Sequence, residues 1–314
     1  MKAIRYHRYG PTDVMALEEV PVPRPGAREV LVKVHAAALN PVDCEIRKGR
    51  LSFLLWRFPR IPGSDFSGEV VAVGSKVRGF HPGDLVYGMS PAFQGGAYAE
   101  YVCVRRDRLA FKPATLGFGE AAGIPLAALT ALQSLRDLAD LQRGQKVFIH
   151  GASGGVGMFA VQLAHAMGAH VTASSSARNL DFIRSLGADV CLDYAITDIA
   201  ALPERFDVFF DVYGNHSFGR VHHLLTPTGT HVTTIPTIKN IGRHFLRPFA
   251  VQKSKMVAVQ SRRDDLDHLR ILCDKGLLRT ITDRIFPLAQ AVEAQEFLET
   301  RRARGKVVLE VIPS

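Results

Sequence analysis

The sequence predicts an α/β protein in which a doubly wound parallel sheet is inserted into a β-barrel-like domain. Short strand patterns punctuated by Gly and Pro fill the N-terminal third, whereas strands and helices alternate regularly after residue 145. Two amphipathic helices and one last strand pattern then close the chain. We therefore expect one domain over residues 1–121 and 264–314, and a second, inserted domain over residues 122–263.

Four strands are expected in the N-terminal part, at residues 29–39, 68–74, 84–89 and 97–104. Their β-branched and aromatic residues favour extended backbone, and turn signals such as Pro25-Gly26 lie between them. The composition then changes, because the stretch from Ala121 to Leu141 is rich in Ala and Leu and predicts a helix.

The regular alternation within the inserted domain begins with KVFIH (146–150), a strand of the buried type. A Gly-rich turn and a helix from Val156 to Met167 follow it. A strand at 170–174 and a helix through 180–186 come next, before the strand patterns DVCLD, FDVFFDV and THVTT. Strands that alternate with helices imply right-handed crossovers and hence a parallel, doubly wound sheet. Helices at 265–275 and 288–300 and the strand KVVLEV complete the chain.

The composition is that of an ordinary soluble enzyme, with 47% hydrophobic and 22% charged residues among 314. No stretch reaches the roughly 18 apolar residues of a membrane-spanning helix, and the N-terminus MKAIRYHRYG has no apolar core of a secretory signal. Four separate cysteines form no CxxC pair, which argues against a disulfide framework and a structural zinc site. We expect a cytoplasmic protein.

The net charge of +9 is concentrated, because the segment between Asp211 and Asp264 holds eight bases and no acid. A nucleic-acid interface is one interpretation. A solvated face is favoured, since no recognition motif accompanies the scattered bases, and no nucleic-acid or membrane partner is expected. Residues 236–259 mix apolar and basic side chains, so they are expected to form a flap or helix near a substrate cleft, with a peripheral membrane helix as the weaker alternative.

A Gly-rich loop, HGASGGVG (150–157), lies between a strand and a helix. Glycines there allow a tight turn and close approach to a pyrophosphate, which the free N–H groups of the helix would bind. The alternative is a glycine run needed only for packing. The strand, the helix and the following βαβ units favour dinucleotide binding, and the expected contacts are Gly151, Ala152, Ser153, Gly154, Gly155 and Val156.

The end of the second parallel strand distinguishes NAD from NADP. NAD sites place an Asp or Glu there to accept from the ribose 2′-OH. This chain instead has the run Ser174, Ser175, Ser176, Ala177, Arg178 and Asn179. Hydroxyls and a guanidinium suit a 2′-phosphate, so NADPH is the expected cofactor, unless Arg178 is only a solvated residue.

These features resemble the medium-chain dehydrogenase/reductase superfamily over nearly the whole chain. The resemblance also rests on the motifs NPVD (40–43), GSDFSG (63–68), GGAYAEY (95–101), PLAALTA (125–131) and GKVVLEV (305–311). The chain looks like its zinc-independent quinone oxidoreductase and enone reductase branch. The resemblance implies a Rossmann domain inserted in a GroES-like catalytic domain. In the zinc enzymes of this family a Cys ligand stands in the stretch at 40–43 and a Gly-His-Glu motif stands at 63–65, so no metal is expected here.

The resemblance implies hydride transfer from the nicotinamide C4 to an electrophilic carbon, with charge developing on the substrate oxygen. Asn40, Asp43 and Thr130 are the expected catalytic residues, and Asn40 and Thr130 should also contact the cofactor. Asn40 is alternatively a turn residue before Pro41, and Thr130 a helix-packing residue. Asp43 is expected to orient its neighbours rather than to act as an acid.

Further positions follow from the same resemblance. Tyr194, Thr234 and Lys306 are expected to contact the cofactor, and Cys44, Phe66 and Tyr98 to line the substrate pocket. The family often reads NPVDY, so Cys44 replaces a Tyr that can donate to the substrate, and a buried inert thiol is favoured over a nucleophile. Asn179 stands where relatives often have a Lys for the 2′-phosphate, a loss for which Arg178 would compensate.

The expected activity is therefore NADPH-dependent reduction of a quinone or α,β-unsaturated carbonyl by a homodimer. An aldehyde or ketone reductase is the alternative within the same class. A weakly catalytic NADPH-binding sensor or structural protein is the alternative from another class.

Overall fold

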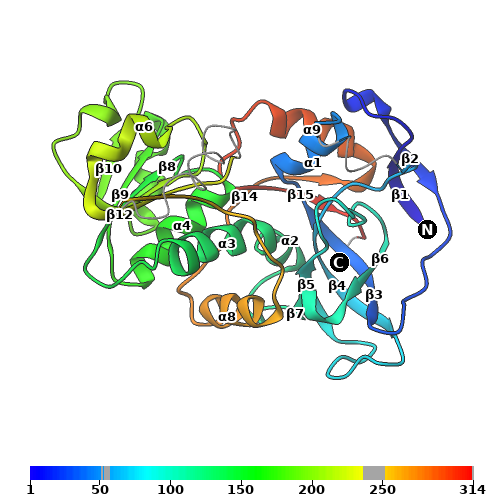
Figure 1. Cartoon of the computed structure of the whole chain (residues 1–314). Helices are drawn as coiled ribbons and strands as arrows, with labels where there is room; N and C mark the ends of the chain where they lie inside the picture. Colours follow the sequence, from blue (N-terminus) through cyan, green and yellow to red (C-terminus); the bar gives the residue numbers. More distant parts are fainter. Residues whose placement is uncertain (51, 53–56, 236–251, 313–314) are drawn as a thin grey trace. The chain divides into compact units, whose positions relative to one another are not determined.

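The computed structural model describes residues 1–50, 52, 57–235 and 252–312, and the chain divides into two compact units (Figure 1). We call Met1–Leu129 with Gln260–Ser314 the barrel unit, and Thr130–Val259 the parallel-sheet unit. The units divide at residues 129 and 259, against boundaries expected at 121 and 263. Within the described residues, no helix has both the length and the apolar character needed to cross a membrane.

The barrel unit is built on a seven-stranded sheet in the order β14-β15-β3-β4-β5-β7, with β6 also paired to β3, and on the hairpin β1-β2. Alternate residues of β3, among them Val30, Val32 and Val34, point into its hydrophobic core. The strands are β1 (Lys2–Tyr6), β2 (Met15–Glu19), β3 (Glu29–Ala38), β4 (Asp65–Val73), β5 (Leu85–Met89), β6 (Tyr101–Arg105), β7 (Leu109–Phe111), β14 (Thr282–Pro287) and β15 (Lys306–Glu310).

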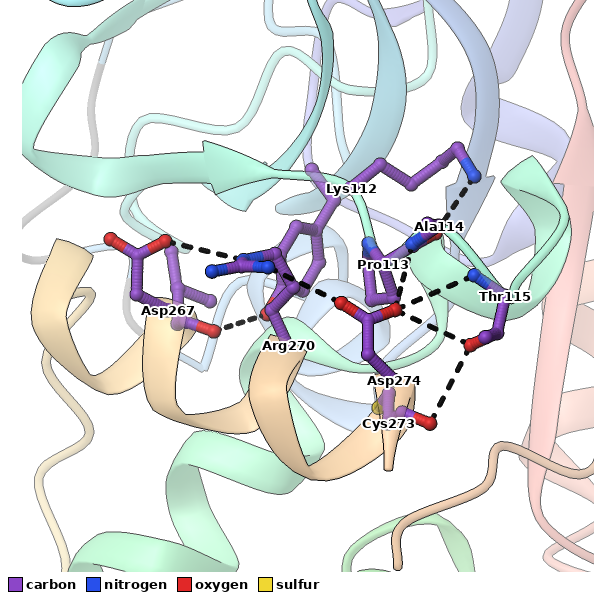
Figure 2. Close-up of polar contacts among 10 residues, drawn as sticks. Lys112, Pro113, Ala114, Thr115, Asp267, Arg270, Cys273 and Asp274 are labelled. Carbon is purple, nitrogen blue, oxygen red and sulfur yellow. Dashed lines mark hydrogen bonds and ion pairs between the residues drawn. The ribbon is translucent and has the colours of Figure 1, made fainter. Parts of the chain in front are cut away.

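The helices of the barrel unit are α1 (Pro41–Arg47), α2 (Phe118–Ala122), α8 (Arg263–Asp274) and α9 (Ala291–Glu299). Helix α8 lies at the start of the C-terminal segment of the barrel unit, and polar contacts anchor it to the loop after β7 (Figure 2). Asp274 accepts the N–H of Ala114 at 2.8 Å and the Arg270 guanidinium at 3.2 Å. The Tyr87 hydroxyl donates to the Leu266 carbonyl at 2.6 Å. These bonds fix the start of the C-terminal segment to the N-terminal strands.

The parallel-sheet unit holds six strands in the order β10-β9-β8-β11-β12-β13, and each neighbouring pair is parallel. This is the predicted doubly wound sheet, and the predicted fold class is confirmed. Its elements are β8 (Lys146–His150), β9 (His170–Ser175), β10 (Val190–Asp193), β11 (Phe206–Asp211), β12 (Leu225–Thr233), β13 (Lys253–Met256), α4 (Gly155–Ala166), α5 (Leu180–Ser185) and α6 (Phe218–Val221).

The predicted helix from Ala121 to Leu141 is wrong as a single element. Gly123 ends α2, and a new helix, α3 (Pro125–Leu132), begins with Pro125 and continues as a π-helix over Gln133–Leu138. Proline fits the first turn of a helix but not its interior, so the proline fixes this break. The flap expected over residues 236–259 lies largely outside the described residues, and only β13 of that segment is described as a regular element.

Candidate functional site

The NPVD sequence forms the junction between β3 and α1. Asn40 is the N-cap of α1, Pro41 occupies the first turn, and the Asp43 carboxylate accepts the backbone N–H of Asn40 at 2.9 Å. An acid three residues after the cap satisfies one of the free N–H groups at the helix start. The sequence thus fixes the backbone of Asn40 locally, within one turn of the helix.

The side chain of Asn40 is fixed by residues from two other strands. Its Oδ1 accepts a hydrogen bond from Lys306 Nζ at 2.6 Å, and its Nδ2 donates to Asp65 Oδ2 at 3.0 Å. Lys306 lies 3.6 Å from Asp65, and none of the three residues is more than 3% exposed. Burial raises the pKa of Asp65 and lowers the pKa of Lys306, while the attraction between them opposes both shifts. Lys306 was expected at the cofactor, but its ammonium is bonded here to Asn40.

Asp43 has a different environment from Asp65. Besides the Asn40 N–H, it accepts a hydrogen bond from the Tyr98 hydroxyl at 3.2 Å. Burial, reinforced by the nearby Asp65 charge, raises the pKa of Asp43 to about 7. The carboxyl also lines a small pocket together with Tyr6, Arg60 and apolar residues. Asp43 is therefore the group of this cluster that changes protonation near neutral pH.

Phe66 and Tyr98, expected in the substrate pocket, are fully buried members of the barrel core. Cys44 is 3% exposed, and burial raises the pKa of its thiol to about 12, which keeps it protonated at neutral pH. Burial also raises the pKa of Tyr98 well above its usual value. Thr130 is buried in α3. The roles of these four residues in substrate and cofactor binding remain predictions.

The donor set around Asp65 does not fit a zinc ion. Zinc sites are built from Cys, His and carboxylate ligands, whereas Asp65 is paired with the Lys306 ammonium, which would repel a second cation. In the part of the chain that the structure describes, no three His, Cys, Asp or Glu side chains are grouped so that they could hold a metal.

The phosphate loop in the parallel-sheet unit has the form that the glycines predict. Gly151 has φ +80°, in the region that favours glycine, and the Ala152 N–H donates to the Ser174 carbonyl at 3.0 Å. A Cβ on Gly157 would lie 2.2 Å from the Gly151 carbonyl oxygen, so only glycine fits there. Gly154 is the N-cap of α4, whose first N–H groups have no helical partner. This cradle fits a pyrophosphate.

A cluster of hydroxyl and amide groups lies beside this loop at the end of β9. Ser175 Oγ donates to Ser153 Oγ at 2.7 Å, and Asn179 Nδ2 lies 3.1 Å from Ser153 Oγ and 3.2 Å from Ser176 Oγ. Arg178 is exposed next to this cluster. The structure thus brings together the groups that the sequence assigned to the adenosine ribose and its 2′-phosphate. Tyr194 is 51% exposed after β10, where its N–H donates to the Ser175 carbonyl at 3.1 Å.

Two residues that the sequence argument did not assign to the site hold the loops at this edge of the sheet. His150 Nδ1 lies 2.8 Å from Ser174 Oγ, and burial lowers the pKa of His150 to about 4, so the ring is neutral. Asp211 accepts the N–H groups of Gly214 and His216, each at 2.7 Å. Both residues end a buried strand, and a polar residue at that position is the signal that could have identified them. The expected contact Thr234 donates its hydroxyl to the Val212 carbonyl at 2.8 Å, at the same edge.

Two family models match the chain. The one described as alcohol dehydrogenase GroES-like domain matches residues 26–114, and the one described as zinc-binding dehydrogenase matches residues 186–309.

Among curated relatives, the chloroplast envelope quinone oxidoreductase homolog of Arabidopsis thaliana is 36% identical over 99% of this chain and 98% of its own. The chloroplastic NADPH-dependent alkenal/one oxidoreductase of the same plant is 36% identical over 100% of this chain and 80% of its own. Among solved structures, the quinone oxidoreductase from Coxiella burnetii matches with a TM-score of 0.92, 36% identity and 99% of both chains. Escherichia coli quinone oxidoreductase complexed with NADPH matches with a TM-score of 0.87, 25% identity, 99% of this chain and 100% of its own.

These relatives overturn the expected cytoplasmic location, since those whose names state a location are chloroplast or mitochondrial proteins. The location was predicted in part from cysteines that lie far apart in the sequence. Such cysteines indicate only that disulfides are lacking, and this does not distinguish the cytoplasm from an organelle. With relatives and solved structures at 36% identity along 99% of its length, the chain belongs to the quinone oxidoreductase branch of the medium-chain dehydrogenase/reductase superfamily.

Proposed function

We propose that this protein reduces quinones or α,β-unsaturated carbonyl compounds with NADPH. The observation that carries the proposal is the phosphate loop with the adjoining cluster of Ser153, Ser175 and Asn179, in a chain 36% identical to an enzyme named for NADPH-dependent reduction of alkenals and enones. A bound NADPH would supply the hydride. The chain's own contribution is to bind the cofactor at the carboxyl edge of the parallel sheet and to hold polar groups in fixed orientations.

The barrel unit holds the Asn40 amide in one orientation. Asn40 cannot rotate its amide, because Lys306 only donates and the Asp65 carboxylate only accepts. Donors fixed in advance need no reorganisation when charge develops, which is why such groups lower reaction barriers. The Asp43 carboxyl, with its pKa of about 7, is the buried group nearby that can hold or release a proton.

The activity is tested by following NADPH oxidation with a panel of alkenals, enones, quinones, saturated aldehydes and ketones. We expect turnover with the conjugated carbonyls or quinones, unchanged by a metal chelator. Turnover restricted to saturated aldehydes or ketones would favour the alternative carbonyl reductase. Binding of NADPH without turnover of any class would favour a sensor or structural role.

We propose NADPH rather than NADH because the hydroxyl and amide groups of Ser153, Ser175 and Asn179 cluster at the end of β9, and the exposed Arg178 adjoins Asn179 in the chain. A charge-assisted hydrogen bond contributes about 1.5–3 kcal/mol, so replacing Arg178 should weaken NADPH roughly ten- to a hundredfold and NADH little. The matched control is Arg184→Ala, which removes an exposed arginine of α5 that pairs with Asp181. Dissociation constants from titration calorimetry decide the point. Equal losses for both cofactors in Arg178→Ala, or a preference of the unmutated protein for NADH, would contradict this assignment.

We also propose a homodimer that pairs through β13. Among the described residues β13 is the last strand of its sheet, and an exposed strand edge offers N–H and C=O groups to another chain. Two identical edges related by a twofold axis extend the sheet across both copies. Light scattering at micromolar concentration should report twice the monomer mass, and a monomer at that concentration would refute the pairing.

A further inference from the structure

Arg47 is the last residue of α1, and its charged side chain is completely buried. Its Nε donates to Gln295 Oε1 at 2.7 Å, and its Nη1 donates to the Gly10 carbonyl at 2.6 Å. Its Nη2 donates to the Glu299 carboxylate, which also pairs with Lys48 at 2.9 Å. The three guanidinium nitrogens therefore hold acceptors from α9 and from the loop after β1.

A guanidinium is not needed merely to fill this space. Taking a charge out of water is costly, and apolar residues of similar volume often stabilise a protein as well as a buried ion pair does. What arginine adds is direction, because its planar group carries several donors at fixed angles. The Gly10 N–H also donates back to the Arg47 carbonyl at 3.0 Å. These contacts fix the end of α1 against α9 (Figure 1).

Helix α1 connects this anchor to Asn40, the N-cap at its opposite end. The helix has seven residues, so it is too short to be stable without its tertiary contacts. With a rise of about 1.5 Å per residue, Asn40 lies about 10 Å from Arg47, and a tilt of about 6° at Arg47 would move Asn40 by about 1 Å. A misplacement of this size can slow a reaction about a hundredfold.

A second path leads from Arg47 through Gln295 to the same end of α1. Gln295 is fully buried, and its Oε1 is occupied by Arg47, so its Nε2 points to other groups. Burial raises the pKa of Tyr98, and the side chain of Gln295 opposes this rise, which places the amide near the Tyr98 hydroxyl. That hydroxyl donates to Asp43, whose carboxylate accepts the N–H of Asn40.

Both paths therefore end at Asn40, the residue of the barrel unit expected to act on the reacting groups. We propose that Arg47 is a positioning residue that acts through Asn40, because it holds α1 in the orientation that the reduction requires. This inference rests on the proposed function. Arg47 should influence the rate of hydride transfer and have little effect on NADPH affinity, since the phosphate loop belongs to the parallel-sheet unit.

The first test replaces Arg47 by lysine, which keeps the charge but cannot direct three donors at separate acceptors. The rate constant of NADPH oxidation by an enone, measured in single turnovers, should fall about ten- to a hundredfold. The calorimetric dissociation constant of NADPH should change less than about twofold, far below the tenfold that 1.4 kcal/mol produces. Arg50→Lys is the matched control, because Arg50 is an exposed arginine just after α1 that pairs with Glu45 at 2.6 Å. Its rate constant should equal that of the unmutated protein.

A double-mutant cycle with Asn40→Ser separates positioning from a general loss of folded protein. Serine can still cap α1, and single turnovers remain measurable in slow variants. If Arg47 acts through Asn40, Arg47→Lys should lower the rate little further in the Asn40→Ser background. A loss of folded protein would instead lower the rate by the same factor in both backgrounds.

Gln295→Met is a second variant that remains informative if Arg47→Lys does not fold. It removes one acceptor and leaves Arg47 bonded to Gly10 and Glu299. The rate constant should fall several-fold, about the loss expected for one hydrogen bond, and this fall should also disappear in the Asn40→Ser background.

Unchanged rates in Arg47→Lys and Gln295→Met, or equal factors in both backgrounds, would overturn the positioning role. An unmutated protein that oxidises NADPH with no enone or quinone would contradict the proposed function instead, so the two failures are distinguishable.

Discussion

Gly157→Ala is expected to abolish tight NADPH binding and to destabilise the parallel-sheet unit. The added Cβ would lie 2.2 Å from the Gly151 carbonyl oxygen and 2.7 Å from the Ala152 Cα, and these are backbone atoms that cannot rotate away. Either the phosphate loop or the start of α4 must move. Overpacking of this kind costs about 1–3 kcal/mol of folding free energy. A displaced loop no longer directs its N–H groups at the pyrophosphate, so NADPH should bind at least about tenfold more weakly.

Gly154→Ala is the matched control in the same loop. Its Cβ would lie 3.6 Å from the Gly151 carbonyl oxygen, an ordinary contact, and its backbone is extended. The melting temperature should therefore stay at the unmutated value, because substitutions without a steric conflict change stability by less than about 0.5 kcal/mol. A Gly157→Ala protein that melts and binds NADPH like the unmutated chain would contradict the packing described for this loop.

Asp43→Asn is expected to stabilise the protein increasingly as the pH rises. The folded-state pKa of about 7 lies above the ordinary aspartate value of 3.8, so the folded state binds this proton more tightly than the unfolded state. The stability linked to that proton is fully present below pH 4 and is lost as the pH rises through about 7. The free energy of unfolding linked to this proton is on the order of a few kcal/mol. Asparagine keeps an acceptor for the Asn40 N–H and carries no charge.

The measurement is the melting temperature of both proteins at pH 5 and pH 8. The difference, variant minus unmutated, should be larger at pH 8. Asp13→Asn, a substitution at an exposed turn, is the control, and its difference in melting temperature should be the same at pH 5 and at pH 8. A difference for Asp43→Asn that stays constant or shrinks with rising pH would show that Asp43 is ionised throughout.

Local patterns in the sequence account for the elements that were predicted well. The strand at Lys146–His150 has the predicted bounds, and α4 begins at Gly155, one residue before the predicted start. Both depend on neighbouring residues, a run of apolar side chains and a glycine-rich turn. In contrast, β1, β2 and β14 were not predicted. Their strands alternate irregularly, as in MALEE of β2, where only Met15 is buried. Such strands are stabilised by their partners rather than by their own pattern.

The contacts of the candidate site likewise divide into those that a local motif predicts and those that join residues far apart in the sequence. The bond between Asp43 and the Asn40 N–H spans three residues, and the motif NPVD was enough to mark both. The bond between Lys306 and Asn40 spans 266 residues, and nothing in the spacing indicates it. His150 was not assigned to the site from the sequence, yet its place at the end of β8 puts it beside the phosphate loop. Position in the topology, which depends on the strand order, was the missing information.

The central claim, hydride transfer from NADPH to a conjugated carbonyl, is tested most directly by isotope transfer. The protein is incubated with an enone and NADPH carrying deuterium at the nicotinamide C4, and the product is analysed by NMR. The account predicts a saturated ketone with deuterium on the carbon β to an intact carbonyl group. Deuterium on the carbonyl carbon of an allylic alcohol, or no transfer from NADPH to any enone or quinone, would contradict it.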